Sequence, residues 1–246
     1  MRWLVLLFAI AQIVTAWLPS GLGVGQSVAA RSEPLTTPVT PAGYAFAIWG
    51  LIYAWSLAFA VWQALPGRRR DGLLDEARGP AALLFAADAA WSLYVQLFAI
   101  DAVSLAIIVA GLAGGLSAMA RLRRLRPPLL SRPSLLARAP LALAAGWISV
   151  AAFANLAAVM ALLHLIPDQL GETGLAAILV AAAGLLVAWV TRATRASLAY
   201  PAAALWGIAA IAVANWGLPY REPVLVAAAA GACLVLLAAA LRPRPR

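Results

Sequence analysis

Eight apolar segments divide the chain, and each has roughly the length that a helix needs to cross a lipid bilayer, about 17–25 residues. The sequence is 65% hydrophobic and only 11% charged, whereas soluble domains carry about 25% charged residues. We therefore predict an all-α fold, a polytopic transmembrane helical bundle of about eight helices. The predicted segments are 3–18, 44–65, 80–100, 102–120, 140–165, 174–191, 199–217 and 223–241.

The basic residues predict how these helices are oriented. All 18 are arginines, and with the N-terminus in the cytoplasm 16 fall in cytoplasmic segments, leaving only Arg31 and Arg221 outside. Cytoplasmic loops carry such an excess. We predict a multi-pass protein of a bacterial-type inner membrane with both termini cytoplasmic. Arginines in short loops also argue against a nucleic-acid partner, despite a net charge of +9. An alternative for the first segment is a cleaved signal peptide, with Val14-Thr15-Ala16 as the cleavage site.

An aromatic-rich stretch begins the second segment. Pro41 and Gly43 interrupt the chain just before it, and Phe46, Trp49 and Tyr53 follow at helical spacing, on one face. A helix in lipid does not need so many large rings on one stripe, but a pocket for a flat apolar ligand does. The preceding outer loop, 19–43, is interpreted either as a lid over the bundle or as a plain connector.

Polar residues inside a membrane are costly and therefore mark candidate functional sites. Asp88 lies in the third segment, three residues before Trp91. Its carboxyl is interpreted in three ways: as a proton relay, as a hydrogen-bonding group in a ligand pocket, or as a neutral structural acid. Asn155 lies eight residues after Trp147, two helical turns, so both fall on nearly the same face.

Other polar groups carry weaker signals. Asn215 is predicted to lie at the membrane interface beside Trp216. His164 with Asp168 and Glu172 is interpreted as a hydrated surface cluster rather than a metal site, and the single Cys233 cannot form an internal disulfide. The sequence contains no phosphate-binding loop, no dinucleotide fingerprint and no hydrolase or metalloprotease motif. Gly111-Leu112-Ala113-Gly114-Gly115 is a small-residue patch that favours close helix packing.

The chain resembles the TspO/MBR family of tryptophan-rich sensory and translocator proteins. Three pieces, in order and in the second, third and fifth helices, carry the resemblance. They are Pro41 with Phe46-Ala47-Ile48-Trp49-Gly50-Leu51-Ile52-Tyr53 and Val61-Trp62; Asp88-Ala89-Ala90-Trp91-Ser92; and Trp147 with Asn155.

The resemblance implies a TspO-like five-helix region at 1–165, followed by three additional helices at 166–246. It also implies a pocket beneath the loop between the first two helices, and ligands of the porphyrin, haem or sterol kind, none bound covalently. The expected partners are this hydrophobic small molecule and membrane lipid. A homodimer is also carried over, although the additional helices would cover the face that five-helix members use for it.

The resemblance places Trp49, Trp91, Trp147 and Asn155 in the pocket wall. Asp88 stands where the family usually has asparagine, so its match is approximate. With Phe46 and Tyr53 from the aromatic stretch, these form the predicted ligand site. We expect a membrane receptor or carrier for a planar hydrophobic ligand, with a sensory or transport role and no catalytic residues. The alternatives are a proton-coupled transporter using Asp88, an enzyme acting on a lipid or pigment, and an assembly factor for a membrane complex.

Overall fold

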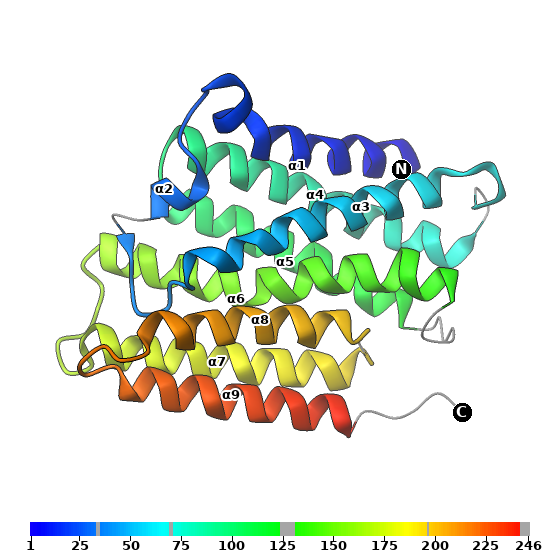
Figure 1. Ribbon diagram of the computed structural model, residues 1–246. Coiled ribbons are helices and arrows are strands. Elements are labelled where there is room, and N and C mark those ends of the chain that lie inside the picture. Colours follow the sequence, from blue (N-terminus) through cyan, green and yellow to red (C-terminus); the bar gives the residue numbers. More distant parts are fainter. Residues whose placement is uncertain (33–34, 69–70, 124–130, 196, 242–246) are drawn as a thin grey trace.

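The computed structural model describes residues 1–32, 35–68, 71–123, 131–195 and 197–241. Eight long helices lie side by side in one bundle (Figure 1), as the apolar segments predict, and the described residues contain no strand. The long helices are α1 (Arg2–Leu22), α3 (Ile48–Ala64), α4 (Gly72–Leu97), α5 (Ala102–Leu122), α6 (Ala139–Leu162), α7 (Gly171–Ala193), α8 (Ala199–Asn215) and α9 (Glu222–Ala240). The short elements are α2 (Val28–Ser32), the 3₁₀ turns Gly43–Ala47 and Pro66–Arg68, and the π turn Ser134–Arg138.

The helices identify a multi-pass membrane protein. Among the described residues, six helices are long and apolar enough to cross a membrane. The other two long helices, α8 and α4, do not meet this requirement, each for its own reason. Helix α8 has only 17 residues. Helix α4 has 26 residues, but Asp88 and Gln96 lower the mean hydropathy of its apolar part.

The beginning of α1 and the end of α9 lie at the same end of the bundle (Figure 1), as an even number of crossings requires. The arginines of the predicted cytoplasmic segments gather at this end. Those that the structure describes are Arg2, Arg68, Arg78, Arg121, Arg123, Arg132, Arg138, Arg192 and Arg195. The others of that set, Arg69, Arg70, Arg124, Arg126, Arg242, Arg244 and Arg246, lie outside the described residues. Which side of the membrane this end faces stays a prediction.

Helix α6 is the centre of the bundle. It packs against α3 and α5 on one side and against α7 and α8 on the other, and most of its residues are buried. The predicted small-residue patch on α5 permits close packing against neighbouring helices, as expected. A Cβ added at Gly114 would lie 2.8 Å from the Leu84 amide nitrogen of α4, and one at Gly115 would lie 2.9 Å from the Ala145 Cβ of α6. Glycine therefore permits both close contacts.

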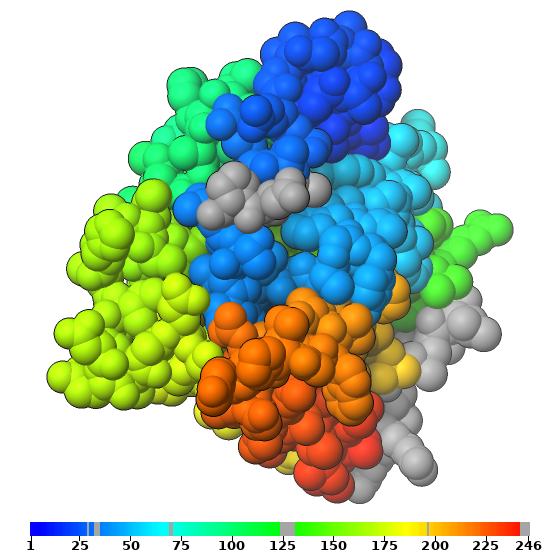
Figure 2. Space-filling view, turned by 60° about the vertical axis from the view of Figure 1, so that its left-hand side comes forward, coloured from blue at the N-terminus to red at the C-terminus, as the bar shows by residue number. Residues whose placement is uncertain are grey.

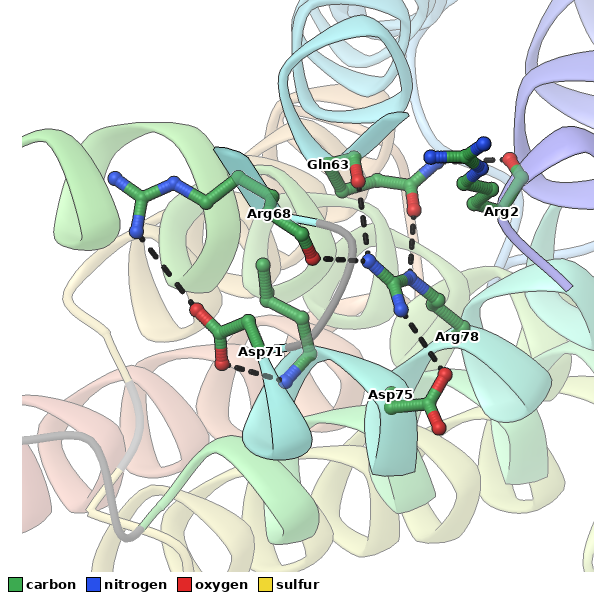
Figure 3. A network of polar contacts seen from close by, with 7 residues as sticks. Arg2, Gln63, Arg68, Asp71, Asp75 and Arg78 are labelled. Atoms are coloured by element: carbon green, nitrogen blue, oxygen red, sulfur yellow. Dashed lines mark hydrogen bonds and ion pairs between the residues drawn. The ribbon is translucent and has the colours of Figure 1, made fainter. Parts of the chain in front are cut away.

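A buried arginine fixes the register of α1, α3 and α4 at the arginine-rich end (Figure 3). The Arg78 guanidinium of α4 donates to the Gln63 side-chain oxygen at 2.9 Å and to the Gln63 and Arg68 carbonyls at 3.1 and 2.8 Å. It also pairs with Asp75 at 3.0 Å. The Gln63 amide in turn donates to the Arg2 carbonyl of α1 at 2.9 Å. Three helices are thus joined through one polar network.

Candidate functional site

The loop between α1 and α3 closes the end of the bundle opposite the arginine-rich end. Its first part is fixed to α4, because the Gln26 amide donates to the Gln96 carbonyl at 3.1 Å. Its second part, which we call the rim segment (residues 37–47), runs between α8 and the aromatic beginning of α3. In Figure 2 this blue part of the chain lies between α1 and the orange α8–α9 connection. The loop is therefore packed into the bundle at both of its ends.

A cavity lies directly beneath this loop. Its volume is about 60 Å³, which is several times the roughly 10–15 Å³ that one water needs. The wall is largely apolar and combines loop residues with α3, α4 and α6. It consists of Val28, Leu35, Thr40, Pro41, Phe46, Trp49, Trp91, Ile100, Trp147, Val150, Ala151, Ala154, Asn155 and Ala158.

Aromatic rings form the deep side of the cavity. Trp147 of α6 meets Phe46 edge to face at a centroid distance of 6.1 Å, and meets Trp49 in the same way, also at 6.1 Å. Trp49 is stacked on Tyr53 at 5.4 Å with an interplanar angle of 23°. Such edge-to-face and stacked pairs hold rings in fixed orientations. The rings of α3 and α6 thus form one preorganised aromatic surface.

Three hydrogen-bond donors in this wall are buried and have no partner among the residues that the structure describes. They are the indole N–H groups of Trp91 and Trp147 and the side-chain amide nitrogen of Asn155. The Asn155 oxygen lies 3.3 Å from the Ser104 hydroxyl, so α5 helps to orient this side chain. Buried polar groups in folded proteins are normally paired. The three unpaired donors belong to residues that line the cavity, so they lie close to the space that a bound molecule would occupy.

Five of the seven predicted site residues come together in this wall: Phe46, Trp49, Trp91, Trp147 and Asn155. The spacing of Trp147 and Asn155 predicts their common face correctly. The sequence analysis missed the small residues Ala151, Ala154 and Ala158, although they follow Trp147 at helical spacing on the same face. It also missed Val28, Leu35 and Ile100, because residues so far apart in the sequence meet only through the fold.

Tyr53 and Asp88 do not line the cavity but lie deeper in the bundle. Tyr53 is one turn beyond Trp49 along α3, and Asp88 is about one turn before Trp91 along α4. Both residues therefore lie about one helical turn farther from the loop than Trp49 and Trp91, which form part of the wall.

Several polar residues lie at about the same depth as Asp88 on the neighbouring helices, and we call Gln12, Tyr53, Ser56 and Asp88 the polar layer. Arg2, Gln63 and Arg78 are joined at the arginine-rich end. Ten residues separate Gln12 from Arg2 on α1, Tyr53 from Gln63 on α3, and Asp88 from Arg78 on α4. Each separation corresponds to about 15 Å along the helix. Gln12 continues the buried stripe of α1 formed by Val5 and Ala9. Three buried atoms of this layer have no partner among the described residues: Gln12 Nε2, Ser56 Oγ and Asp88 Oδ2.

The aromatic motifs and the cavity that they form are the features by which the chain resembles the TspO/MBR family. A family model described as TSPO-like protein matches residues 2–241. The chain belongs to the TSPO-like family. This finding confirms the resemblance predicted from the motifs. Comparisons with curated proteins and with solved structures found no match.

In this TSPO-like protein the match continues through α7, α8 and α9, beyond the region that carries the motifs. The division at residue 165 into a five-helix region and three additional helices stays a prediction. The additional helices are closely joined to the motif region. Gly146 of α6 lies against the Tyr200 backbone of α8, and the Ser149 and Tyr200 hydroxyls are 2.9 Å apart.

Asn215 is the last residue of α8, and its predicted place at the membrane interface stays a prediction. Its side chain is buried, with only 2% of its surface exposed, whereas the neighbouring Trp216 is 78% exposed. Its amide donates to the Pro38 carbonyl of the rim segment at 2.8 Å. Successive residues of a helix point in directions about 100° apart, so Asn215 faces the loop while Trp216 faces the surroundings of the protein. No group of three or more metal-binding side chains occurs within the part of the chain that the structure describes.

Proposed function

We propose that this TSPO-like protein is a membrane receptor or carrier for a planar apolar ligand of the porphyrin kind that carries hydrogen-bond acceptors. The observation that carries the proposal is the set of three buried, unpartnered donors in an aromatic wall, at Trp91, Trp147 and Asn155. Apolar pockets with a few convergent polar groups are typical small-molecule sites. The rings supply contact area and the donors select and orient an acceptor such as a carboxylate.

The size of the cavity adds a condition to this proposal. Pockets that enclose drug-sized ligands have volumes of roughly 300–1,000 Å³, well above the 60 Å³ observed here. The cavity as described is therefore too small for a tetrapyrrole, and binding one requires the wall to move apart. The helices of the wall pack closely against their neighbours, whereas the rim segment is joined to the bundle by a few contacts. We expect opening to occur at the loop.

Binding of protoporphyrin to the purified protein in detergent tests this function. We expect Asn155→Leu to lower the affinity roughly 3–10-fold, because one hydrogen bond contributes about 0.5–1.5 kcal/mol. Trp49→Ala combined with Trp147→Ala should lower the affinity further, since it removes two facing rings. The measurement is a titration of the porphyrin absorbance, with quenching of tryptophan fluorescence as a second signal.

The matched control is Trp189→Ala, which removes a ring of α7 that is 66% exposed and away from the cavity. It should bind protoporphyrin like the wild type. Equal and weak binding by wild type, control and cavity variants would rule out the proposed pocket. Each variant is first compared with the wild type in helical content, so that loss of binding is not loss of fold.

The polar layer supports a second candidate function, a proton-coupled transporter using Asp88. A buried carboxyl with an oxygen that has no partner among the described residues is a place where a proton can be held, and the unpaired atoms of Gln12 and Ser56 lie on neighbouring helices. We expect Asp88→Asn to abolish uptake driven by a pH gradient into proteoliposomes, because the amide cannot exchange a proton. Protoporphyrin is the first substrate to test.

The control for this experiment is Asp168→Asn, which changes an exposed acid in the α6–α7 connection and should leave uptake intact. Gradient-driven uptake that persists in Asp88→Asn would exclude this carboxyl as the coupling group. Wild-type protein that shows no gradient-driven uptake would count against the transporter and leave the receptor function in place.

A further inference from the structure

Three hydrogen bonds fasten the rim segment to α8. The Asn215 amide donates to the Pro38 carbonyl at 2.8 Å, the Ala42 amide donates to the Ala210 carbonyl at 3.1 Å, and the Trp206 indole donates to the Ala45 carbonyl at 3.0 Å. Rim residues 38, 42 and 45 are bonded, in that order, to α8 residues 215, 210 and 206. The rim segment and α8 therefore run in opposite directions, and the contacts extend along α8 for more than two turns.

Side-chain packing follows the same path. The Tyr44 and Trp206 rings meet edge to face at 5.5 Å. Val39 is buried in the hydrophobic cluster formed by the C-terminal helices, and Ala45 is buried in the cluster of the N-terminal helices. The rim segment is thus held between the two halves of the bundle. Its other face carries Thr40, Pro41 and Phe46 into the cavity wall.

The turn within the rim segment is closed by its own bonds. The Thr40 amide donates to the Thr37 carbonyl at 2.9 Å, and the Thr37 amide donates to the Thr40 hydroxyl at 2.9 Å. A turn that satisfies its own polar groups can move as a unit. Within the described residues, such a movement must break the three hydrogen bonds to α8 and the packing beside them, and it must also separate Phe46 from Trp147.

We infer that α8 is the anchor of the cavity mouth, and that release of the rim segment from Asn215, Ala210 and Trp206 opens the cavity. Asn215 and Trp206 are positioning residues in this proposal, since neither lines the cavity. In this proposal the C-terminal helices, through α8, control access to the ligand site. It rests on the proposed function only for the identity of what enters.

Access to the cavity can be measured without any ligand. A cysteine introduced by Ala154→Cys on the α6 wall, in a Cys233→Ala background, reports opening through its rate of reaction with a small water-soluble thiol reagent. Trp206→Phe keeps an aromatic ring against Tyr44 but removes the indole donor. Asn215→Leu keeps a branched side chain of similar size but removes the amide. Each change should raise the labelling rate roughly 2–10-fold, as expected for the loss of one hydrogen bond, and the double change should raise it further.

The control is Trp216→Phe, which removes an indole donor from the exposed neighbour of Asn215 and should label at the wild-type rate. Unchanged labelling in both Trp206→Phe and Asn215→Leu would overturn the inference. If Asn215→Leu fails to fold, Trp206→Phe decides alone, because its ring contact is retained. A general loosening of the protein is recognised by faster amide exchange in α4 and α5, and faster labelling that occurs only with such loosening also overturns the inference.

Protoporphyrin separates this inference from the proposed function. If the ligand enters through the anchored mouth, the two α8 variants should speed both its association and its dissociation. Wild-type protein that does not bind protoporphyrin, together with faster labelling of the variants, rejects the proposed ligand and supports the anchor. Protoporphyrin binding with unchanged labelling rejects the anchor and supports the pocket.

Discussion

Replacing Arg78 by methionine is expected to lower the free energy of unfolding by about 3–5 kcal/mol. The guanidinium is 3% exposed and serves the Gln63 side chain and the carbonyls of Gln63 and Arg68. Methionine fills a similar space but donates no hydrogen bond, so these buried acceptors lose their partner. Each unpaired acceptor costs roughly 1–3 kcal/mol. The measurement is the unfolding equilibrium in mixed detergent micelles, followed by circular dichroism.

Arg121→Met is the matched control. Its guanidinium is largely exposed and lies 4.0 Å from Glu76, a pair that contributes at most about 1 kcal/mol. Arg78→Lys should recover only part of the lost stability, because a single ammonium cannot reproduce the planar fork of donors. A difference of less than about 1 kcal/mol between Arg78→Met and Arg121→Met would show that the network does not hold α1, α3 and α4 together.

The second large effect is expected at Gly146, where α6 and α8 approach most closely. A Cβ added to this residue would lie 2.2 Å from the Tyr200 carbonyl oxygen. Because that oxygen belongs to the backbone, the clash is relieved only by moving one helix. We expect Gly146→Ala to destabilise the protein by about 3 kcal/mol, at the upper end of ordinary overpacking costs. Thermal unfolding in detergent measures this loss.

Gly50→Ala is not expected to destabilise the protein. Apart from the nearby backbone of α3 itself, no atom of the described residues lies within 4 Å of the Cβ that this change adds, and alanine is the better helix former by up to about 1 kcal/mol. The protein should therefore be unchanged or slightly more stable. Equal stability of Gly146→Ala and Gly50→Ala would mean that α8 yields easily. The Ser149–Tyr200 contact and the rim segment would then not depend on a rigid α8.

The sequence by itself determined the helices, their order and the common end of the termini. The reason is physical: in a bilayer, backbone groups must be paired within each segment, so length and hydropathy are enough to identify helices. The motif residues Trp49, Trp91 and Trp147 come together around one cavity, and their contact with a ligand stays a prediction. Here the three aromatic motifs, together with the helical spacing of Trp147 and Asn155, carried the information.

Only the tertiary structure decided which polar residues face which neighbours. Asn215 and Trp216 are adjacent in the sequence, yet one is bonded to the rim segment and the other is exposed. Asp88 and Trp91 belong to one motif, yet only Trp91 reaches the cavity. The orientation of each helix about its own axis is fixed by contacts between helices, such as the Gly146 contact and the Arg78 network. Those contacts join residues that are far apart in the sequence, so no local pattern contains them.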